Sequence, residues 1–221
     1  MSRISATLID DVGTDPNAQL ITVPHLRVVA VTTRGRPKGW RQIDVRPREY
    51  LTPAEVEKLA TAAKARGRYG SRDAFMIRFC ARHGFRASEL VELLWSAIDL
   101  DGGSLTVNRK KNGQASIHYL EGWEIRMLRQ LKREAKGSRF VLNSERAGPM
   151  TRAGFQRIVE RAGDEAKFDF PVHPHMLRHA AGYRLVNEGR DTRSLAGYLG
   201  HKNMMHTARY AELNVERFKD W

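Results

Sequence analysis

Signals for the start and stop of α-helices recur along the chain from Thr52 onward, and they constrain its fold more than any other feature. Thr52 and Glu55 form a capping-box pattern around Pro53, which suits the first position of a helix, and apolar residues at helical spacing follow. Further helices are predicted over residues 71–84, 88–94, 121–136, 151–162, 174–187 and 191–199, and from Lys202 onward, with Gly84, Gly137 and Gly163 as stop signals. We therefore expect a mainly helical body.

One stretch, residues 97–120, breaks the helical pattern. Two turn signals, Asp101-Gly102-Gly103 and Asn112-Gly113, separate three short runs of β-type residues that include SLTVN and ASIHYL. This pattern predicts a small three-stranded antiparallel sheet. The expected fold class is thus mainly α with one small sheet (α+β).

Residues 1–48 differ from the rest of the chain. The β-branched run Ile21–Val31 predicts a lone strand, whereas residues 34–48 are basic, contain proline and glycine, and favour an extended arm. A domain boundary is therefore expected near Arg48, with a basic, partly extended N-terminal arm over residues 1–48 and a folded domain over residues 49–221.

The charge balance indicates a polyanionic partner. Lys and Arg number 38 against 25 Asp and Glu, a formal net charge of +13 in 221 residues. Nucleic acid is favoured, because Lys and Arg neutralise its phosphates. An anionic membrane surface is the alternative, but we find no strongly amphipathic basic helix and no lipidation signal. Asp10 and Asp11 argue against a signal peptide, and the one cysteine, Cys80, excludes an internal disulfide, so we expect a cytoplasmic, nucleoid-associated protein.

Three segments place cationic and titratable residues beside apolar ones: HGFRASEL at 83–90, HPHMLRH at 173–179 and YLGHKNMMHTARY at 198–210. In the first, Arg86 lies between a helix stop and a new helix, where its guanidinium suits a fixed contact with an anion. The alternative is a surface arginine that pairs with Glu89, three residues on.

In the second segment, His175 and Arg178 are three residues apart and share one face of a helix near its N-terminus, where backbone amides favour phosphate. A capping histidine beside a solvated arginine is the alternative. His173 and His179 lie nearby in the sequence, but no carboxylate or cysteine accompanies them, so we expect no metal site.

In the third segment, Tyr210 follows His201 by nine residues. The reference pKa of a tyrosine is about 10, so only on the order of one phenol in a thousand is ionised near neutrality. Two arginines that hold a phosphodiester, and a histidine that takes the phenolic proton, would make Tyr210 a nucleophile without metal or cofactor. A lysine of the predicted turn RKKNGQ, Lys110 or Lys111, can protonate the leaving sugar hydroxyl. A half-buried structural tyrosine and a solvated basic turn are the alternatives.

Taken in order, these motifs resemble those of the tyrosine recombinase (phage integrase) family, over roughly residues 47–218. The resemblance implies these roles: Arg86 as the first catalytic arginine, Lys111 in preference to Lys110 as the catalytic lysine, His175 and Arg178 as the His-x-x-Arg pair, His201 as the second histidine, Tyr210 as the nucleophile and Glu89 as a support for Arg86.

The resemblance also implies a reaction and an assembly. Tyr210 forms a 3′-phosphotyrosyl intermediate in double-stranded DNA, a 5′-hydroxyl leaves, and a hydroxyl of a partner strand attacks, with resolution through a Holliday junction. The outcome is inversion, integration or excision, and no nucleotide cofactor is needed because the phosphotyrosine keeps the bond energy. The implied assembly is a homotetramer on two inverted-repeat sites, with residues 214–221 exchanged between neighbours and with accessory DNA-bending proteins.

The motifs and the short chain especially resemble the compact DNA invertases that control fimbrial phase variation. Typical family members carry a separate helical core-binding domain before the catalytic one, which 48 residues do not supply. The core of an AT-hook resembles Arg34-Gly35-Arg36-Pro37, so Arg34, Arg36 and Lys38 are expected to bind DNA, as is Lys110; a solvated linker is the alternative. Two other functions stay open: a DNA-relaxing enzyme like the type IB topoisomerases, and a DNA-binding regulator with an inert site.

Overall fold

The computed structural model describes residues 49–109, 115–145 and 148–201, together with Asn203, Thr207 and Tyr210 and the backbone of strands β1 (Gln19–Ile21) and β2 (Val29–Val31). The chain divides into two compact units, Met1–Pro47 and Arg48–Trp221. The second unit holds the residues that the motifs single out, apart from those of the arm.

The first unit contains a short antiparallel strand pair. β1 and β2 pair with Gln19 opposite Val31 and Ile21 opposite Val29. The prediction of a lone strand over Ile21–Val31 was therefore wrong. Pro24 falls between the two strands in the sequence, and proline lacks the N–H that a continuous paired strand needs. Arg34, Arg36 and Lys38 lie outside the described residues.

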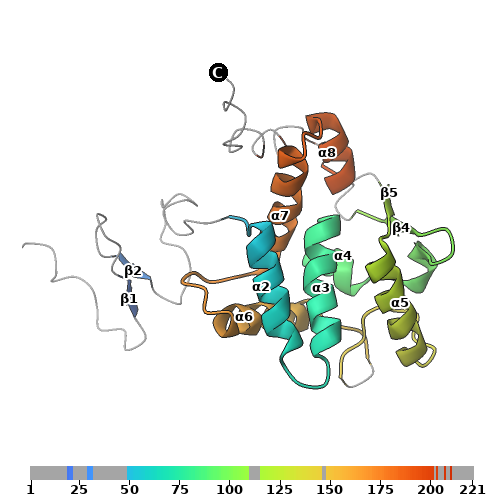
Figure 1. Ribbon diagram of the computed structural model, residues 1–221, viewed down its shortest axis with the longest axis horizontal. Coiled ribbons are helices and arrows are strands. Elements are labelled where there is room, and N and C mark those ends of the chain that lie inside the picture. The colour runs from blue at the N-terminus through green and yellow to red at the C-terminus, as the bar shows by residue number, and fades with distance from the viewer. Residues whose placement is uncertain are drawn as a thin grey trace, which may run out of the picture. The chain divides into compact units, whose positions relative to one another are not determined.

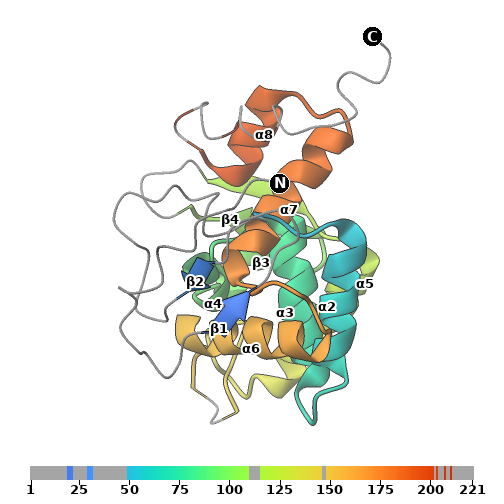
Figure 2. The same ribbon diagram turned by 90° about the vertical axis from the view of Figure 1, so that its left-hand side faces the viewer.

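Two helices that lie side by side, α2 (Pro53–Lys64) and α3 (Gly70–His83), form the centre of the second unit (Figures 1 and 2). The predicted capping box is confirmed: the Glu55 amide donates to Thr52 Oγ1 at 3.3 Å, and the Thr52 amide donates to Glu55 Oε2 at 2.8 Å. α3 ends, as predicted, at Gly84, which adopts a left-handed φ of 62°. Both helices bury the apolar faces that their spacing predicts, including Val56, Leu59, Phe75, Ile77, Phe79 and Cys80.

A short helix and the sheet follow α3. α4 (Ala87–Val91) is shorter than the predicted 88–94, because Leu94 pairs in a β-bridge with Phe140. The 3-10 turn η1 (Trp95–Ala97) leads into three strands, β3 (Ile98–Asp99), β4 (Ser104–Val107) and β5 (Ser116–Tyr119). They pair antiparallel in the order β3-β4-β5, which confirms the predicted sheet.

Four more helices follow among the described residues: α5 (Gly122–Glu134), α6 (Arg152–Glu165), α7 (Pro174–Asn187) and α8 (Thr192–Leu199). α7 has the predicted bounds. The predicted stop at Gly163 was wrong, since α6 continues through it and the left-handed residue after the helix is Lys167. A Cβ at Gly163 would lie 3.1 Å from Val172 side-chain atoms, so this glycine serves a close approach of two segments. Beyond His201, Thr207 and Tyr210 are helical, where a helix was predicted from Lys202.

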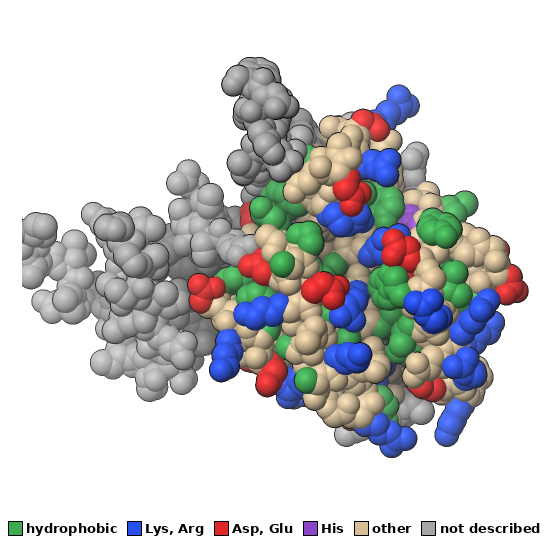
Figure 3. Space-filling model, in the orientation of Figure 1, with side chains coloured by type: hydrophobic (Ala, Val, Ile, Leu, Met, Phe, Trp, Pro, Cys, Tyr) green, Lys and Arg blue, Asp and Glu red, His purple; other side chains and the backbone are tan. Residues whose placement is uncertain are grey.

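The main core lies between α2, α3, α6 and α7, and α5 lies with the sheet on the side of α3 away from α2 (Figure 1). A second, smaller core joins α7 and α8 and contains Leu195, Leu199 and Tyr210. In Figure 3, Lys and Arg side chains spread over the face shown, with Asp and Glu side chains between them. Within the described part of the chain, no helix is long and apolar enough to cross a bilayer.

Candidate active site

Arg86 lies at a sharp corner between two helices. Gly84 ends α3, and Arg86 is the N-cap of α4 with extended backbone angles. Its amide donates to Glu89 Oε2 at 2.9 Å, and its Nη1 donates to Glu89 Oε1 at 2.5 Å. The pairing with Glu89 that the sequence offered as an alternative is therefore present. The Glu89 side chain is 1% exposed and that of Arg86 is 25% exposed, so a buried carboxylate holds a guanidinium that still reaches the surface.

Arg178, on α7, contacts the same corner from the interior of the protein. Its Nη1 donates to the carbonyl of Gly84 at 2.5 Å and its Nη2 donates to the carbonyl of Leu199 at 2.7 Å. Nη1 also lies 3.8 Å from Glu89 Oε2. The side chain is 2% exposed, so the alternative of a solvated arginine is wrong. Arg178 thus ties the α3–α4 corner to the end of α8.

A third arginine, Arg109, completes this group, and the motifs did not single it out. Its Nη1 donates to Glu89 Oε2 and to the carbonyl of Gly84, both at 3.1 Å. Its Nη2 donates to the carbonyls of His83, at 3.1 Å, and Tyr198. In the sequence Arg109 is only the first residue of a basic turn, and no local signal separates a buried arginine from a solvated one.

The arginine cluster, made of Arg86, Arg109 and Arg178 around Glu89, contains three groups with shifted pKa values: Glu89, Arg109 and Arg178. Burial alone would raise the pKa of the Glu89 carboxyl, but hydrogen bonds from Arg86 and the charges of Arg109 and Arg86 outweigh it and lower that pKa. Burial, followed by the charges of Arg86 and Arg109, lowers the pKa of Arg178 to about 10. The cluster holds three guanidinium groups around one carboxylate, and this excess of positive charge suits an anion.

Tyr210 lies in the small core between α7 and α8, with 4% of its surface exposed. Its hydroxyl is 2.9 Å from Nδ1 of His179, and its ring meets that of Tyr183 edge-on at 5.2 Å. The ring lies on the backbone of α7, since a Cβ at Gly182 would be 2.7 Å from the Tyr210 ring atoms Cε1 and Cζ. The Tyr210 ring can therefore pack this closely on α7 only because residue 182 is a glycine.

Two histidines, His179 and His201, lie against this tyrosine, and a third, His175, contacts His179. His201 stacks parallel to the Tyr210 ring at 6.3 Å and its Nδ1 is 3.0 Å from Thr207 Oγ1. The ring of His175, which is exposed, contacts that of His179 at 4.4 Å. The sequence predicts no catalytic role for His179, yet its Nδ1 lies within hydrogen-bond distance of the Tyr210 hydroxyl. Its position next to Arg178 in HPHMLRH was the available signal, but the sequence does not show where Tyr210 lies.

The structure thus brings the predicted residues together in two groups: Arg86, Glu89 and Arg178 at the corner, and His201 and Tyr210 beside α8. His175 lies in the first turn of α7, where its ring contacts His179. Lys110 and Lys111 lie outside the described residues, between Arg109 and β5. Among the residues that are described, no group of three or more His, Cys, Asp or Glu side chains is arranged to hold a metal ion.

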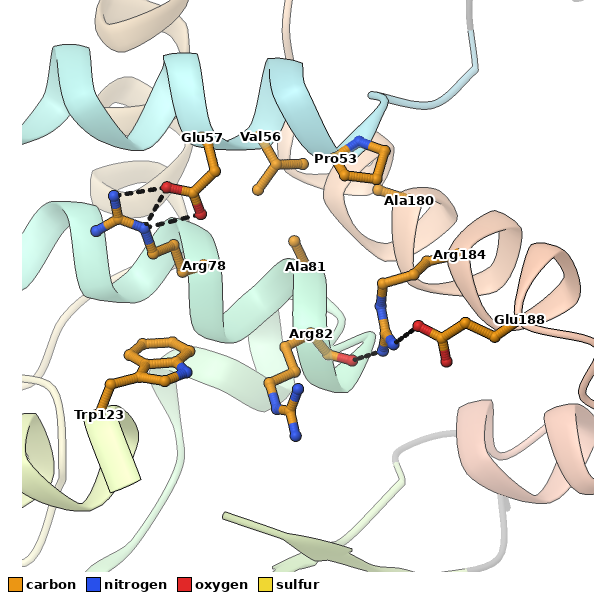
Figure 4. A pocket seen from close by; sticks show the side chains of 10 residues that line it. All are labelled: Pro53, Val56, Glu57, Arg78, Ala81, Arg82, Trp123, Ala180, Arg184 and Glu188. Carbon is orange, nitrogen blue, oxygen red and sulfur yellow. Dashed lines mark hydrogen bonds and ion pairs between the residues drawn. The ribbon is translucent and has the colours of Figure 1, made fainter. Parts of the chain in front are cut away.

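A groove of about 600 Å³ lies elsewhere on the unit, between α2, α3, α5 and α7 (Figure 4). Four of its charged side chains pair within it, Arg78 with Glu57 at 2.8 Å and Arg184 with Glu188 at 2.6 Å, whereas Arg82 pairs with Glu121, which does not line the groove. None of the predicted site residues lines it. The groove is therefore separate from the arginine cluster and from Tyr210.

Comparisons with known proteins identify the family. Residues 49–217 match the Phage integrase family. The chain is 38% identical over 177 residues to the type 1 fimbriae regulatory protein FimE of Escherichia coli strain K12, covering 77% of this chain and 89% of FimE. The expected resemblance to this family and to short fimbrial proteins is confirmed.

Two solved structures show the fold. The crystal structure of XerA recombinase superposes with a TM-score of 0.66 at 24% identity, covering 77% of this chain and 62% of XerA. XerH site-specific recombinase bound to its difH substrate, in a pre-cleavage complex, superposes with a TM-score of 0.65 at 19% identity, covering 74% of this chain and 50% of XerH. The chain spans about half to three fifths of these two proteins, and by its family match it belongs to the phage integrase family.

Proposed function

We propose that this protein is a site-specific recombinase that cleaves and rejoins double-stranded DNA through a 3′-phosphotyrosyl intermediate on Tyr210. The observation that carries the proposal is the seating of Tyr210 against α7, next to the turn of helix from which Arg178 enters the arginine cluster. One helix, α7, thus supplies Arg178 to the anion site and the surface on which the Tyr210 ring lies. The membership of the phage integrase family supports the same chemistry.

The arginine cluster would hold the scissile phosphate. Arg178 is fixed by two backbone carbonyls and Arg86 by Glu89, while a guanidinium carries five N–H donors, so donors remain for phosphate oxygens. Because Arg86 and Arg178 are positioned before substrate binds, they stabilise the charge that develops on the phosphorus oxygens without reorganising.

The reaction moves two protons. The Tyr210 oxygen attacks phosphorus as the phenolic proton passes to a histidine, and the bond from phosphorus to the 5′-oxygen breaks as Lys111 protonates that oxygen. His179 is placed to accept the phenolic proton, since its Nδ1 is 2.9 Å from the hydroxyl. His201, whose ring stacks on that of Tyr210 at 6.3 Å, and His175, whose ring contacts that of His179, would hydrogen-bond the phosphate.

Recombination needs more than one protomer. We propose a homotetramer that joins two inverted-repeat sites, with residues 214–221 exchanged between neighbours and accessory proteins that bend the DNA. XerH, which shares the fold, was solved on its DNA substrate. DNA as the partner would place the protein at the nucleoid, and the outcome of the reaction, inversion, integration or excision, depends on how the sites are arranged.

A nicked suicide substrate tests the proposal. We expect wild-type protein to form a covalent adduct that denaturing gel electrophoresis detects, and Tyr210→Phe to form none while its affinity for the same DNA stays within about twofold. Tyr69→Phe, in a loop at the start of α3, is the matched control and should retain the adduct. A wild-type protein that binds DNA without forming the adduct would instead be a regulator. Relaxation of supercoils without any paired-site product would indicate an enzyme like the type IB topoisomerases.

A further inference from the structure

The described residues at both ends of the β4–β5 connection are held by buried polar contacts. β4 ends at Val107, and Arg109, two residues later, is buried in the arginine cluster. β5 begins at Ser116, whose hydroxyl oxygen is 2.8 Å from Nε2 of His118. Lys110 and Lys111 lie in the sequence between these two anchors.

From Ser116 a chain of hydrogen bonds runs into the core. Nδ1 of His118 is 3.0 Å from Nδ1 of His83, and Nε2 of His83 is 2.9 Å from Glu124 Oε1. His83 and Glu124 are fully buried and His118 is 2% exposed. These hydrogen bonds therefore connect the first residues of β5 to the C-terminal end of α3 and to α5.

The donors and acceptors in this chain can be assigned from its inner end. Glu124 Oε2 accepts from the Glu121 amide at 2.8 Å and lies 3.3 Å from Nε of Arg82, so its carboxylate acts as an acceptor. Nε2 of His83 must then donate to Glu124, which leaves Nδ1 of His83 to accept from His118. Nε2 of His118 in turn accepts from the Ser116 hydroxyl. The Ser116 hydroxyl also lies 3.4 Å from the carbonyl of Tyr198, so His118 and Tyr198 together set its orientation.

Tyr198 packs against the outer side of this chain of hydrogen bonds. The Tyr198 ring stacks on His118 at 3.8 Å, and the Tyr198 hydroxyl donates to the carbonyl of Arg82 at 3.1 Å. The Tyr198 carbonyl accepts from Arg109. Tyr198 of α8 therefore contacts both anchors, since its carbonyl accepts from Arg109 and lies within reach of the Ser116 hydroxyl. It is next to Leu199, whose carbonyl accepts from Arg178.

A buried polar chain of this kind is a poor way to gain stability, because apolar side chains of similar size do so without desolvating charges. It is a good way to fix register, since a shift of β5 by one residue would turn His118 from the core to solvent. In the observed register His118 lies opposite Leu105.

We propose that His118, acting through Ser116, and Arg109 are positioning residues for the protonation of the 5′-oxygen of the leaving strand by Lys111, because they hold the two described ends of the β4–β5 connection. His118 and Ser116 are positioning residues and do not touch DNA. The inference rests on the proposed function, and in particular on a lysine that donates a proton to the leaving group.

A substrate with sulfur in place of the bridging 5′-oxygen tests this directly. A thiol has a pKa of about 8.5, far below that of an alcohol, so a thiolate leaves without help from a general acid. A variant that has lost only the placement of the lysine should cleave the ordinary substrate slowly and the sulfur substrate at the wild-type rate. A variant with a general structural defect should be slow on both.

The main variant is His118→Asn, because the asparagine amide can still donate to Nδ1 of His83 while the contact with Ser116 is lost. We expect single-turnover cleavage of the ordinary substrate to slow about 10- to 100-fold, which is part of the rate enhancement that a general acid provides. Cleavage of the sulfur substrate should stay within about threefold of the wild-type rate. Ser116→Ala should show the same pattern more weakly, and it decides the matter if His118→Asn does not fold.

Two reference variants complete the experiment. Lys111→Ala should lose more on the ordinary substrate and recover on the sulfur substrate, and Ser104→Ala, at the other end of the β4–β5 ladder, should leave both rates unchanged. Equal slowing of His118→Asn on both substrates, or no slowing on either, would overturn the inference while leaving the recombinase intact. Absence of any adduct with wild-type protein would overturn the proposed function and this inference with it.

Discussion

At the scale of single residues, the position of Tyr210 depends on the absence of a side chain at Gly182. Gly182 on α7 has no side chain, and the tyrosine ring occupies the space that a Cβ would need. The Tyr210 hydroxyl then meets His179, one turn earlier on the same helix. A glycine in a helix interior usually reduces stability, so its presence here is explained by the seat that it makes for the tyrosine.

Gly182→Ala should therefore displace Tyr210. The added Cβ would lie 2.7 Å from two ring atoms, so we expect adduct formation to slow at least about tenfold and the protein to lose about 1–3 kcal/mol of stability through overpacking. Single-turnover cleavage and urea unfolding would measure the two effects.

Gly197→Ala is the matched control, because a Cβ at this exposed position of α8 meets nothing within 4 Å. It should leave cleavage unchanged and raise stability by up to about 1 kcal/mol through helix propensity. Equal cleavage rates for the two variants would show that Tyr210 does not depend on this seat.

At the scale of elements, the buried histidines make the contact of β5 with α3 and α5 sensitive to acid. Burial, followed by the charges of His83 and Arg109, lowers the pKa of His118 to about 3, and burial also lowers that of His83. An unfolded chain binds protons at these residues below about pH 6.5, whereas the folded protein does not. The stability of the fold is then complete above pH 6.5 and declines as the pH falls from 6.5 toward 3.

For His118 alone this effect amounts to about 2 kcal/mol at pH 5 relative to neutral pH. Urea unfolding at pH 7.5 and pH 5 should show the loss, and His118→Asn, which has no group that titrates in this range, should show a difference between the two pH values that is smaller by about the same amount. An identical difference for wild type and variant would mean that His118 is protonated in the folded protein.

At the scale of the whole molecule, the residues behind the formal net charge of +13 are expected to lie on the surfaces that contact DNA. The face in Figure 3 mixes both signs of charge, whereas residues 34–48 of the arm are predominantly basic. We propose that Arg34, Arg36 and Lys38 contact the DNA backbone or its minor groove beside the site.

Replacing all three residues by Ala should weaken binding to specific DNA and reduce the slope of log affinity against log salt by up to about 2.7, because each lost phosphate contact contributes about 0.9. Fluorescence anisotropy at several salt concentrations measures both quantities. Changing Arg34 and Arg36 to Lys keeps the charge and should preserve the slope while reducing any preference for A/T-rich DNA. Deletion of residues 1–48 without change in affinity or slope would rule out a role for the arm.

The local signals in the sequence were sufficient for most of the elements. The capping box at Thr52, the left-handed Gly84 and the bounds of α7 act over a few neighbouring residues, so they can be recognised without knowing the fold. The order of the motifs was likewise sufficient for the family. The predicted helix stop at Gly163 was wrong because the sequence does not distinguish a glycine inside a helix from one at its end. The packing of Gly163 against Val172 makes that distinction.

By itself, then, the sequence determined the helical body, the small sheet, the family and the residues to consider for the site. The tertiary structure decided which of these side chains meet, because the decisive contacts join residues that are distant in the chain: Arg178 with the carbonyl of Gly84, 94 positions away, and Arg109 with that of Tyr198, 89 positions away. Hydrogen-bond partners over such separations depend on how the helices pack. Arg109, His179 and His118 therefore became recognisable only in the folded protein.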